Sequence, residues 1–220
     1  MTTSRSTGGD TSLRSVTRGI AFALVLVLVL AGCGGDSEEE TPSERSDTRA
    51  AEPEPEPEPE PDSPLEKAAQ AAGCELQSTT ASTRGHTEDI EAPVDYDTNP
   101  PTTGKHFQIA AEDGFYKRAV PDTALVHSHE HGRVVLWFKP RLPGKVRAAL
   151  LYVFTQDPYQ MLLVPRSEMP FDIAATAWNA EPGPQGTGRL LGCSSFSPRA
   201  LEALREFRDE HRGRGPEVIP

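Results

Sequence analysis

Residues 36–64 constrain the chain most, because they divide it into a part that can fold and a part that cannot. The segment consists mainly of Glu, Pro, Ser and Asp, alternates Glu with Pro from Glu52 to Pro61, and has no aliphatic side chain larger than alanine. Such a segment cannot bury enough apolar surface to offset the entropy lost on ordering. We therefore predict an extended acidic tether, with a reach on the order of 90 Å at about 3.1 Å per residue.

The residues before the tether have the pattern of an export signal. Three arginines precede an apolar run, residues 20–30, that carries no charge. This run is far shorter than the roughly 20 residues that span a bilayer as a helix. It ends at Leu30-Ala31-Gly32-Cys33, which resembles a bacterial lipobox. We expect residues 1–32 to be a lipoprotein signal peptide and 33–64 a tether that begins at a lipidated Cys33, so that the membrane lipid is a partner and the protein lies at the extracytoplasmic face of the cell envelope.

The negative charge belongs to the tether rather than to the rest of the chain. Residues 36–64 contain 12 acids and 2 bases, a net charge of −10, whereas residues 65–220 carry −3 of the total of −11. A segment near neutrality without a basic stripe gives no support to nucleic-acid binding. Residues 65–220 have the length of one domain with its own core.

Lipidation of Cys33 would leave Cys74 and Cys193 as the remaining cysteines. Outside the cytoplasm such a pair usually forms a disulfide, and no closely spaced two-cysteine redox motif competes with that interpretation. We predict a Cys74–Cys193 bridge.

Hydrophobic patterns predict an α+β domain with a loop-rich N-terminal half. Residues 134–138 form a continuous β-branched and aromatic run, typical of a strand buried on both faces. Strands are also expected at 161–164 and 171–177. Helices are expected at 65–72, from Pro143 to Asp157, and after Ser197-Pro198, where Ser197 has the pattern of an N-cap. This order favours a small mixed or antiparallel sheet covered by helices.

Residues 127–132 read His-Ser-His-Glu-His-Gly, which places three of the six histidines of the chain within five positions. In a strand, His127, His129 and His131 would share a face, an arrangement that can hold a transition metal. In a helix, His127 and His131 would lie one turn apart, and the spelling fits the His-x-x-Glu-His pattern of inverted zinc proteases. The strand formers that follow disfavour the helix, and with it the protease.

Two further histidines, His86 and His106, follow turn-forming residues. Such loops could bring them close to the histidines at 127–131 and so complete a site. His211, at the end of a predicted helix, is interpreted as a favourable charge at the negative end of the helix dipole. Met161 and Met169 are expected in the core, and the glycine-rich residues 183–188 lack the lysine of a phosphate-binding loop and are expected to form a surface loop.

Several motifs together resemble a bacterial family designated domain of unknown function 3105. They are Pro-Pro-Thr-Thr-Gly-Lys-His-Phe at 100–107, Gly-Phe-Tyr at 114–116, Val-His-Ser-His-Glu-His-Gly-Arg-Val at 126–134 and Ala177-Trp178, with His86 and Tyr96 at matching places. The resemblance implies an exported, often lipid-anchored protein without an established activity. It also implies that the pattern residues of the family are His86, His106, His127, Glu130 and His131, whereas His129 is an extra histidine here.

We therefore expect a metal site in which His86, His106, His127 and His131 supply imidazole nitrogens, with His129 and Glu130 as auxiliary residues. Imidazole-rich sites suit Cu(II) or Zn(II). Four histidines would favour storage, sensing or delivery, whereas three histidines and a water would permit hydrolysis with Glu130 as general base. An envelope hydrolase and a metal-free envelope binding module remain alternative interpretations.

Overall fold

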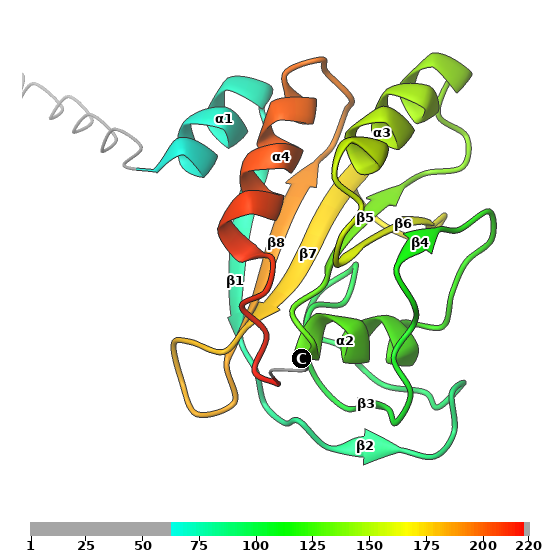
Figure 1. Ribbon diagram of the computed structural model, residues 1–220, viewed down its shortest axis with the longest axis vertical. Helices are drawn as coiled ribbons and strands as arrows, with labels where there is room; N and C mark the ends of the chain where they lie inside the picture. Colours follow the sequence, from blue (N-terminus) through cyan, green and yellow to red (C-terminus); the bar gives the residue numbers. More distant parts are fainter. Residues whose placement is uncertain (1–62, 218–220) are drawn as a thin grey trace, which may run out of the picture. The chain divides into compact units, whose positions relative to one another are not determined.

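The computed structural model describes residues 63–217 (Figure 1). The predicted signal peptide, the lipidation of Cys33 and the acidic tether as far as residue 62 lie outside the described residues, whereas Ser63 and Pro64, the last two residues assigned to the tether, are the N-cap and the first residue of a helix. Within 63–217, no helix is both long enough and apolar enough to cross a membrane.

The domain is built on a six-stranded sheet with the strand order β1-β8-β7-β5-β6-β4. The β1, β8, β7 and β5 strands pair antiparallel, and β5, β6 and β4 pair parallel. The fold is therefore α+β with a mixed sheet, as predicted. The strand bounds are Glu75–Thr80 (β1), Gly114–Phe115 (β4), Val134–Phe138 (β5), Met161–Pro165 (β6), Ile173–Asn179 (β7) and Thr187–Cys193 (β8).

Three helices cover one face of this sheet: α1 (Pro64–Ala72), α3 (Gly144–Gln156) and α4 (Ala200–His211) (Figure 1). The α1 helix begins with a capping box, in which the Ser63 hydroxyl accepts from the Glu66 backbone N–H and the Glu66 carboxylate accepts from the Ser63 N–H. The apolar sides of the three helices share one core cluster with alternate residues of the central strands, among them Leu136 and Leu163. Burial of this continuous apolar layer is the main stabilising contribution on this face.

Within the described residues, the opposite face carries one helix, α2 (Asp122–Glu130), and long loops. Two short strands, β2 (His86–Thr87) and β3 (His106–Phe107), pair parallel beside this helix. A smaller core lies between α2 and the sheet, where Leu125 packs with Trp137. Polar loop structure on this face agrees with the predicted loop-rich N-terminal half.

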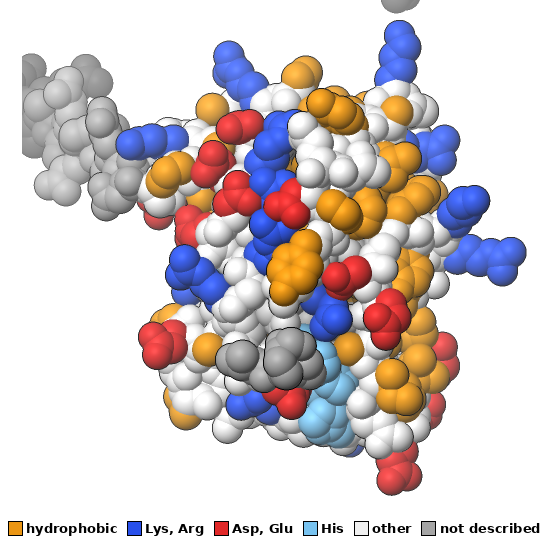
Figure 2. Space-filling model, in the orientation of Figure 1, with side chains coloured by type: hydrophobic (Ala, Val, Ile, Leu, Met, Phe, Trp, Pro, Cys, Tyr) orange, Lys and Arg blue, Asp and Glu red, His pale blue; other side chains and the backbone are white. Residues whose placement is uncertain are grey.

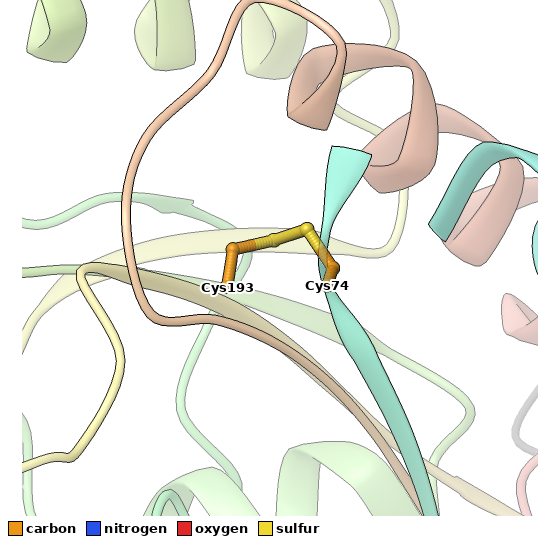
Figure 3. The surroundings of a disulfide bond; sticks show 2 residues. All are labelled: Cys74 and Cys193. Atoms are coloured by element: carbon orange, nitrogen blue, oxygen red, sulfur yellow. A yellow bond between two sulfur atoms is a disulfide. The ribbon is translucent and has the colours of Figure 1, made fainter. Parts of the chain in front are cut away.

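A disulfide joins Cys74 to Cys193, as predicted from the two cysteines that remain if Cys33 is lipidated (Figure 3). It links the residue just before β1 to the last residue of β8, on the face that the three helices cover. The two cysteines are 119 positions apart in the sequence.

The predicted strands and helices are present, and the core residues Trp137, Phe138, Met161 and Met169 are buried, as expected. The β8 strand was not predicted, and residues 187 and 188 of the predicted surface loop belong to it. Its glycines, Gly188 and Gly192, lower the strand propensity of the segment, which is why the strand was missed. Packing requires glycine at 192, because a Cβ there would lie 2.4 Å from the Phe171 ring.

Two local predictions were wrong. The Ser197 hydroxyl does not cap α4, because the Ser197 carbonyl accepts the Ala200 N–H in a preceding turn and the helix starts only at Ala200. His211 does end α4, but it is buried, and burial lowers its pKa to about 4, aided by Arg189 and Arg214. It is therefore neutral at pH 7 and contributes packing and a hydrogen bond from Asn179 rather than a charge.

Candidate metal centre

The small parallel sheet places His86 and His106 side by side. In the β2–β3 register these two residues are direct partners, and their ring centroids lie 4.5 Å apart. The loop before β3 prepares this pairing, because Gly104 has a φ of +126° that suits glycine and its close contact with the Tyr96 ring leaves little room for a side chain. The Tyr96 hydroxyl donates to the Lys105 carbonyl and holds the same turn.

The α2 helix supplies His127 and Glu130. The prediction that disfavoured a helix here was therefore wrong: residues 122–130 are helical, and His131 is the C-cap. The helix lacks the usual hydrophobic period because all of its residues from Thr123 to Glu130 are buried, the polar ones included. At helical spacing, the residues three and four positions after His127 lie on its face.

These segments bring together four ligand atoms, one each from His86, His106, His127 and Glu130, all within 4.8 Å of one another. The rings of His106 and His127 have centroids 4.8 Å apart, and His86 lies 5.1 Å from His127. His106, His127 and Glu130 are buried, whereas the His86 side chain is 48% exposed. The cluster is therefore closed on the protein side and open to solvent at His86.

Two atoms in the cluster lack the hydrogen bonds that buried polar groups normally make. His106 Nε2 and Glu130 Oε2 lie 2.9 Å apart, yet neither has an aligned hydrogen-bond partner among the described residues. Leaving such groups unsatisfied costs free energy. Two ligand atoms about 2.0 to 2.1 Å from one tetrahedral ion are about 3.3 Å apart, so a small separation of these two atoms would let a shared cation satisfy both.

The other atoms of these side chains have partners that orient them. His106 Nδ1 faces the Gly104 carbonyl at 2.8 Å, and His127 Nδ1 faces the Phe107 carbonyl. A carbonyl only accepts, so each Nδ1 carries the proton and each Nε2 has a free lone pair in the neutral ring. Histidine ligands are held in this way in metal sites, where the second ring nitrogen donates to the protein.

Arg84 holds the remaining oxygen of Glu130, with its Nε donating to Oε1 over 2.7 Å. Burial by itself would raise the pKa of Glu130, but the contacts with His106 and Arg84 outweigh it and lower the pKa to about 2. Burial lowers the pKa of His127, and the neighbouring His106 and His131 lower it further. At neutral pH the cluster thus contains an ionised carboxylate and a His127 ring that favours its neutral form.

His131 is not among these four residues. The ring centroids of His131 and His127 lie 4.4 Å apart, but His131 belongs to a second group of possible metal ligands, together with His127 and Glu217. Its Nε2 is 3.3 Å from Glu217 Oε2, and Arg133 donates to its Nδ1. A ring that accepts at Nδ1 carries its neutral proton at Nε2, where it faces the carboxylate. In the neutral ring His131 is therefore arranged as a donor to Glu217, and its predicted role as a ligand of the same ion as His86 and His106 stays a prediction, because His127, His131 and Glu217 form a separate group that could hold a metal ion.

The C-terminal segment brings Glu217 to this place. The Gly213 N–H donates to the Gly132 carbonyl and the Glu217 N–H donates to the Glu130 carbonyl, so the segment runs against the end of α2. Gly215 fits so closely that a Cβ there would lie 2.3 Å from the Glu130 carbonyl oxygen. Figure 2 shows histidine side chains at the surface beside this segment.

His129 lies apart from the cluster and is fully buried. Trp137 Nε1 donates to the Thr176 hydroxyl, whose oxygen lies 2.9 Å from His129 Nε2. Burial lowers the pKa of His129 to about 3, so the ring is neutral. The predicted auxiliary role of His129 finds no support in this position, because the side chain links α2 to the sheet.

Sequence reasoning missed two residues at this site. Arg84 was noticed only as part of a turn, although its position two residues before His86 was a usable signal. Glu217 carried no signal, because only the fold brings the C-terminus to α2.

The family model described as "Protein of unknown function (DUF3105)" matches residues 87–219. No curated protein and no solved structure matches the chain. The matched range contains His106, His127, Glu130 and His131, and starts one residue after His86. Since the match spans more than half of the 220 residues, the chain belongs to the DUF3105 family.

Proposed function

We propose that the protein is an extracytoplasmic lipoprotein that binds one Cu(II) or Zn(II) ion through His86, His106, His127 and Glu130. The convergence of these four ligand atoms within 4.8 Å carries the proposal. The buried atoms His106 Nε2 and Glu130 Oε2 also support it, since an ion bound between them would give a partner to both the lone pair and the carboxylate oxygen.

The donor set agrees with this choice of metals. Three imidazoles and one carboxylate suit Zn(II), which takes four nitrogen and oxygen ligands, and also Cu(II), which such sites generally bind more tightly. Four protein ligands leave no open position on a tetrahedral ion. We therefore favour storage, sensing or delivery of the metal over catalysis.

The state of Glu130 also supports a ligand role over that of a general base. A general base works best when its pKa lies near the operating pH. The pKa of Glu130 is about 2, and Arg84 occupies one of its oxygens. A carboxylate of this kind accepts protons poorly but remains negatively charged for a cation.

The cellular place of the protein completes the proposal. The basic N-terminus, the short apolar run and the lipobox-like residues before Cys33 favour export and lipid anchoring. The acidic tether would then hold the metal centre away from the membrane. The exposed side of His86 is the side from which an ion could enter or leave.

Metal analysis of protein purified from cell envelopes without a histidine tag tests the proposal. We expect one Cu or Zn per chain, and we expect His106→Ala and His127→Ala to lose it. His131→Gln is the matched control, because it removes a neighbouring histidine outside the four-ligand group and should retain the ion. Protein that is metal-free, and whose melting temperature does not rise with added Cu or Zn, would show that the metal proposal is wrong and favour a binding module.

A further inference from the structure

A second feature of the domain lies away from the histidines, between α3 and the β4 edge of the sheet. It is a groove of about 290 Å³. The buried side chains of Phe138 and Leu163 form part of its floor, and Leu151 and Phe115 line its sides. Phe115 is 42% exposed although it is a large aromatic residue on an edge strand. The proposed metal centre uses none of these residues.

Two cations lie at the rim of this groove, Lys117 from the segment after β4 and Arg147 from the first turns of α3. No ion pair neutralises either side chain within residues 63–217. The first turn of α3 lacks an acidic residue and a side-chain cap, so the positive end of the helix dipole adds to the positive charge of Lys117 and Arg147 at the groove. Figure 2 shows apolar side chains gathered on this side of the molecule, with lysine and arginine side chains projecting beside them.

An apolar floor below two unpaired cations is complementary to an amphiphilic anion. The volume of about 290 Å³ lies at the lower end of the range for small-molecule sites, which favours a short ligand. Medium-chain fatty carboxylates such as octanoate match this size, with the chain over Phe138 and Leu163 and the carboxylate between Lys117 and Arg147. Ligand sites typically combine such an apolar lining with a few placed polar groups.

We propose that this groove binds a medium-chain acyl carboxylate. Calorimetric titration of the full chain in lipid nanodiscs with octanoate tests it, with empty nanodiscs as the reference. We expect saturable one-to-one binding by octanoate and much weaker binding by octanol, octylamine and acetate, which lack the charge, reverse it or lack the chain.

Variants locate the binding. Lys117→Gln with Arg147→Gln should weaken octanoate binding at least about tenfold, since hydrogen bonds to charged groups contribute more than neutral ones. Gly144→Leu should abolish it, because Gly144 lines the groove, has no positive φ, and a Cβ there meets open space. Lys145→Gln, on the same helix but not in the groove lining, is the matched control and should bind as the parent does.

Three results would overturn the proposal. Heats that equal those of empty nanodiscs would show that octanoate only partitions into lipid. Octanol that binds as tightly as octanoate would show that the cations do not select the ligand. Unchanged binding by Gly144→Leu, with a circular dichroism spectrum that matches the parent protein, would place the ligand elsewhere.

Discussion

The two faces of the sheet are stabilised in different ways. The face under α1, α3 and α4 is a continuous apolar layer closed by a disulfide, whereas the face under α2 buries histidines, a glutamate and short polar loops. Apolar contacts stabilise a face regardless of its exact chemistry, while buried polar groups stabilise only when each has its partner. The apolar face therefore maintains the fold in a general way, whereas the stability of the α2 face depends on specific partners for its buried polar groups.

The largest effect is expected from removing the disulfide. Replacing both Cys74 and Cys193 with alanine should lower the free energy of unfolding by about 4 to 5 kcal/mol, because a bridge that closes a loop of more than 100 residues restricts the unfolded chain strongly. Urea denaturation of the parent and the variant measures the loss. Affinity for zinc should persist while the variant remains folded; a loss of affinity in folded protein would show that the two faces are not independent.

Acid should destabilise the protein through its buried histidines. The folded-state pKa of His211 is lowered from 6.5 to about 4 by burial, so the unfolded state takes up the proton first as the pH falls through 6.5. The stability contributed by the neutral ring should decline between pH 6.5 and 4, by about 3 kcal/mol at full loss. Denaturation across this range measures it, and His211→Gln should show a shallower pH dependence than the parent.

Metal should act on the α2 face alone. Zinc at about 100 times its dissociation constant should raise the free energy of unfolding by about 2.7 kcal/mol, since the ion binds the folded site and not the unfolded chain. His106→Ala should remove this increment, as thermal denaturation with and without zinc would reveal. An equal increment in the variant would contradict the proposed site.

The closely fitted C-terminal segment offers a smaller test. Gly215→Ala places a Cβ against the Glu130 carbonyl and the Gly132 N–H, which are backbone atoms that cannot move freely. We expect a loss of about 1 to 3 kcal/mol, the usual cost of overpacking. Hydrogen exchange at the end of α2 should accelerate more than exchange in β7 and β8; uniform acceleration would mean that the segment stabilises the whole domain.

The smallest effect is expected for Glu217→Gln. The Glu217 side chain is 45% exposed and His131 is half of a partly solvated pair, so the free energy of unfolding should change by less than about 1 kcal/mol. Zinc affinity should change little, because neither residue belongs to the four-ligand group. A large loss of affinity, measured by competition with a chelator, would show that the ion lies between His127, His131 and Glu217 instead.

The two faces also differ in how well they could be predicted. Residues 134–138 were recognised as a continuous β-branched and aromatic run, and the helix after Pro143 was recognised from apolar residues at helical spacing. The α2 helix was not, because burial of His127, Ser128 and Glu130 replaces an apolar face with polar groups that have individual partners. The structure brings three of the four expected histidines together with Glu130, whereas His131 lies in a second group with His127 and Glu217.

Sequence alone predicted the pairing of Cys74 with Cys193 and the α+β class, both of which the structure confirms, and it singled out the histidines of the candidate site. These follow from composition, residue counts and local periodicity, which need no knowledge of contacts. Only the tertiary structure decided that His129 packs against the sheet, that Arg84 and Glu130 join the cluster as a pair, and that Glu217 reaches His131. Those outcomes depend on which distant segments pack together in the interior, and local sequence patterns do not predict such long-range contacts.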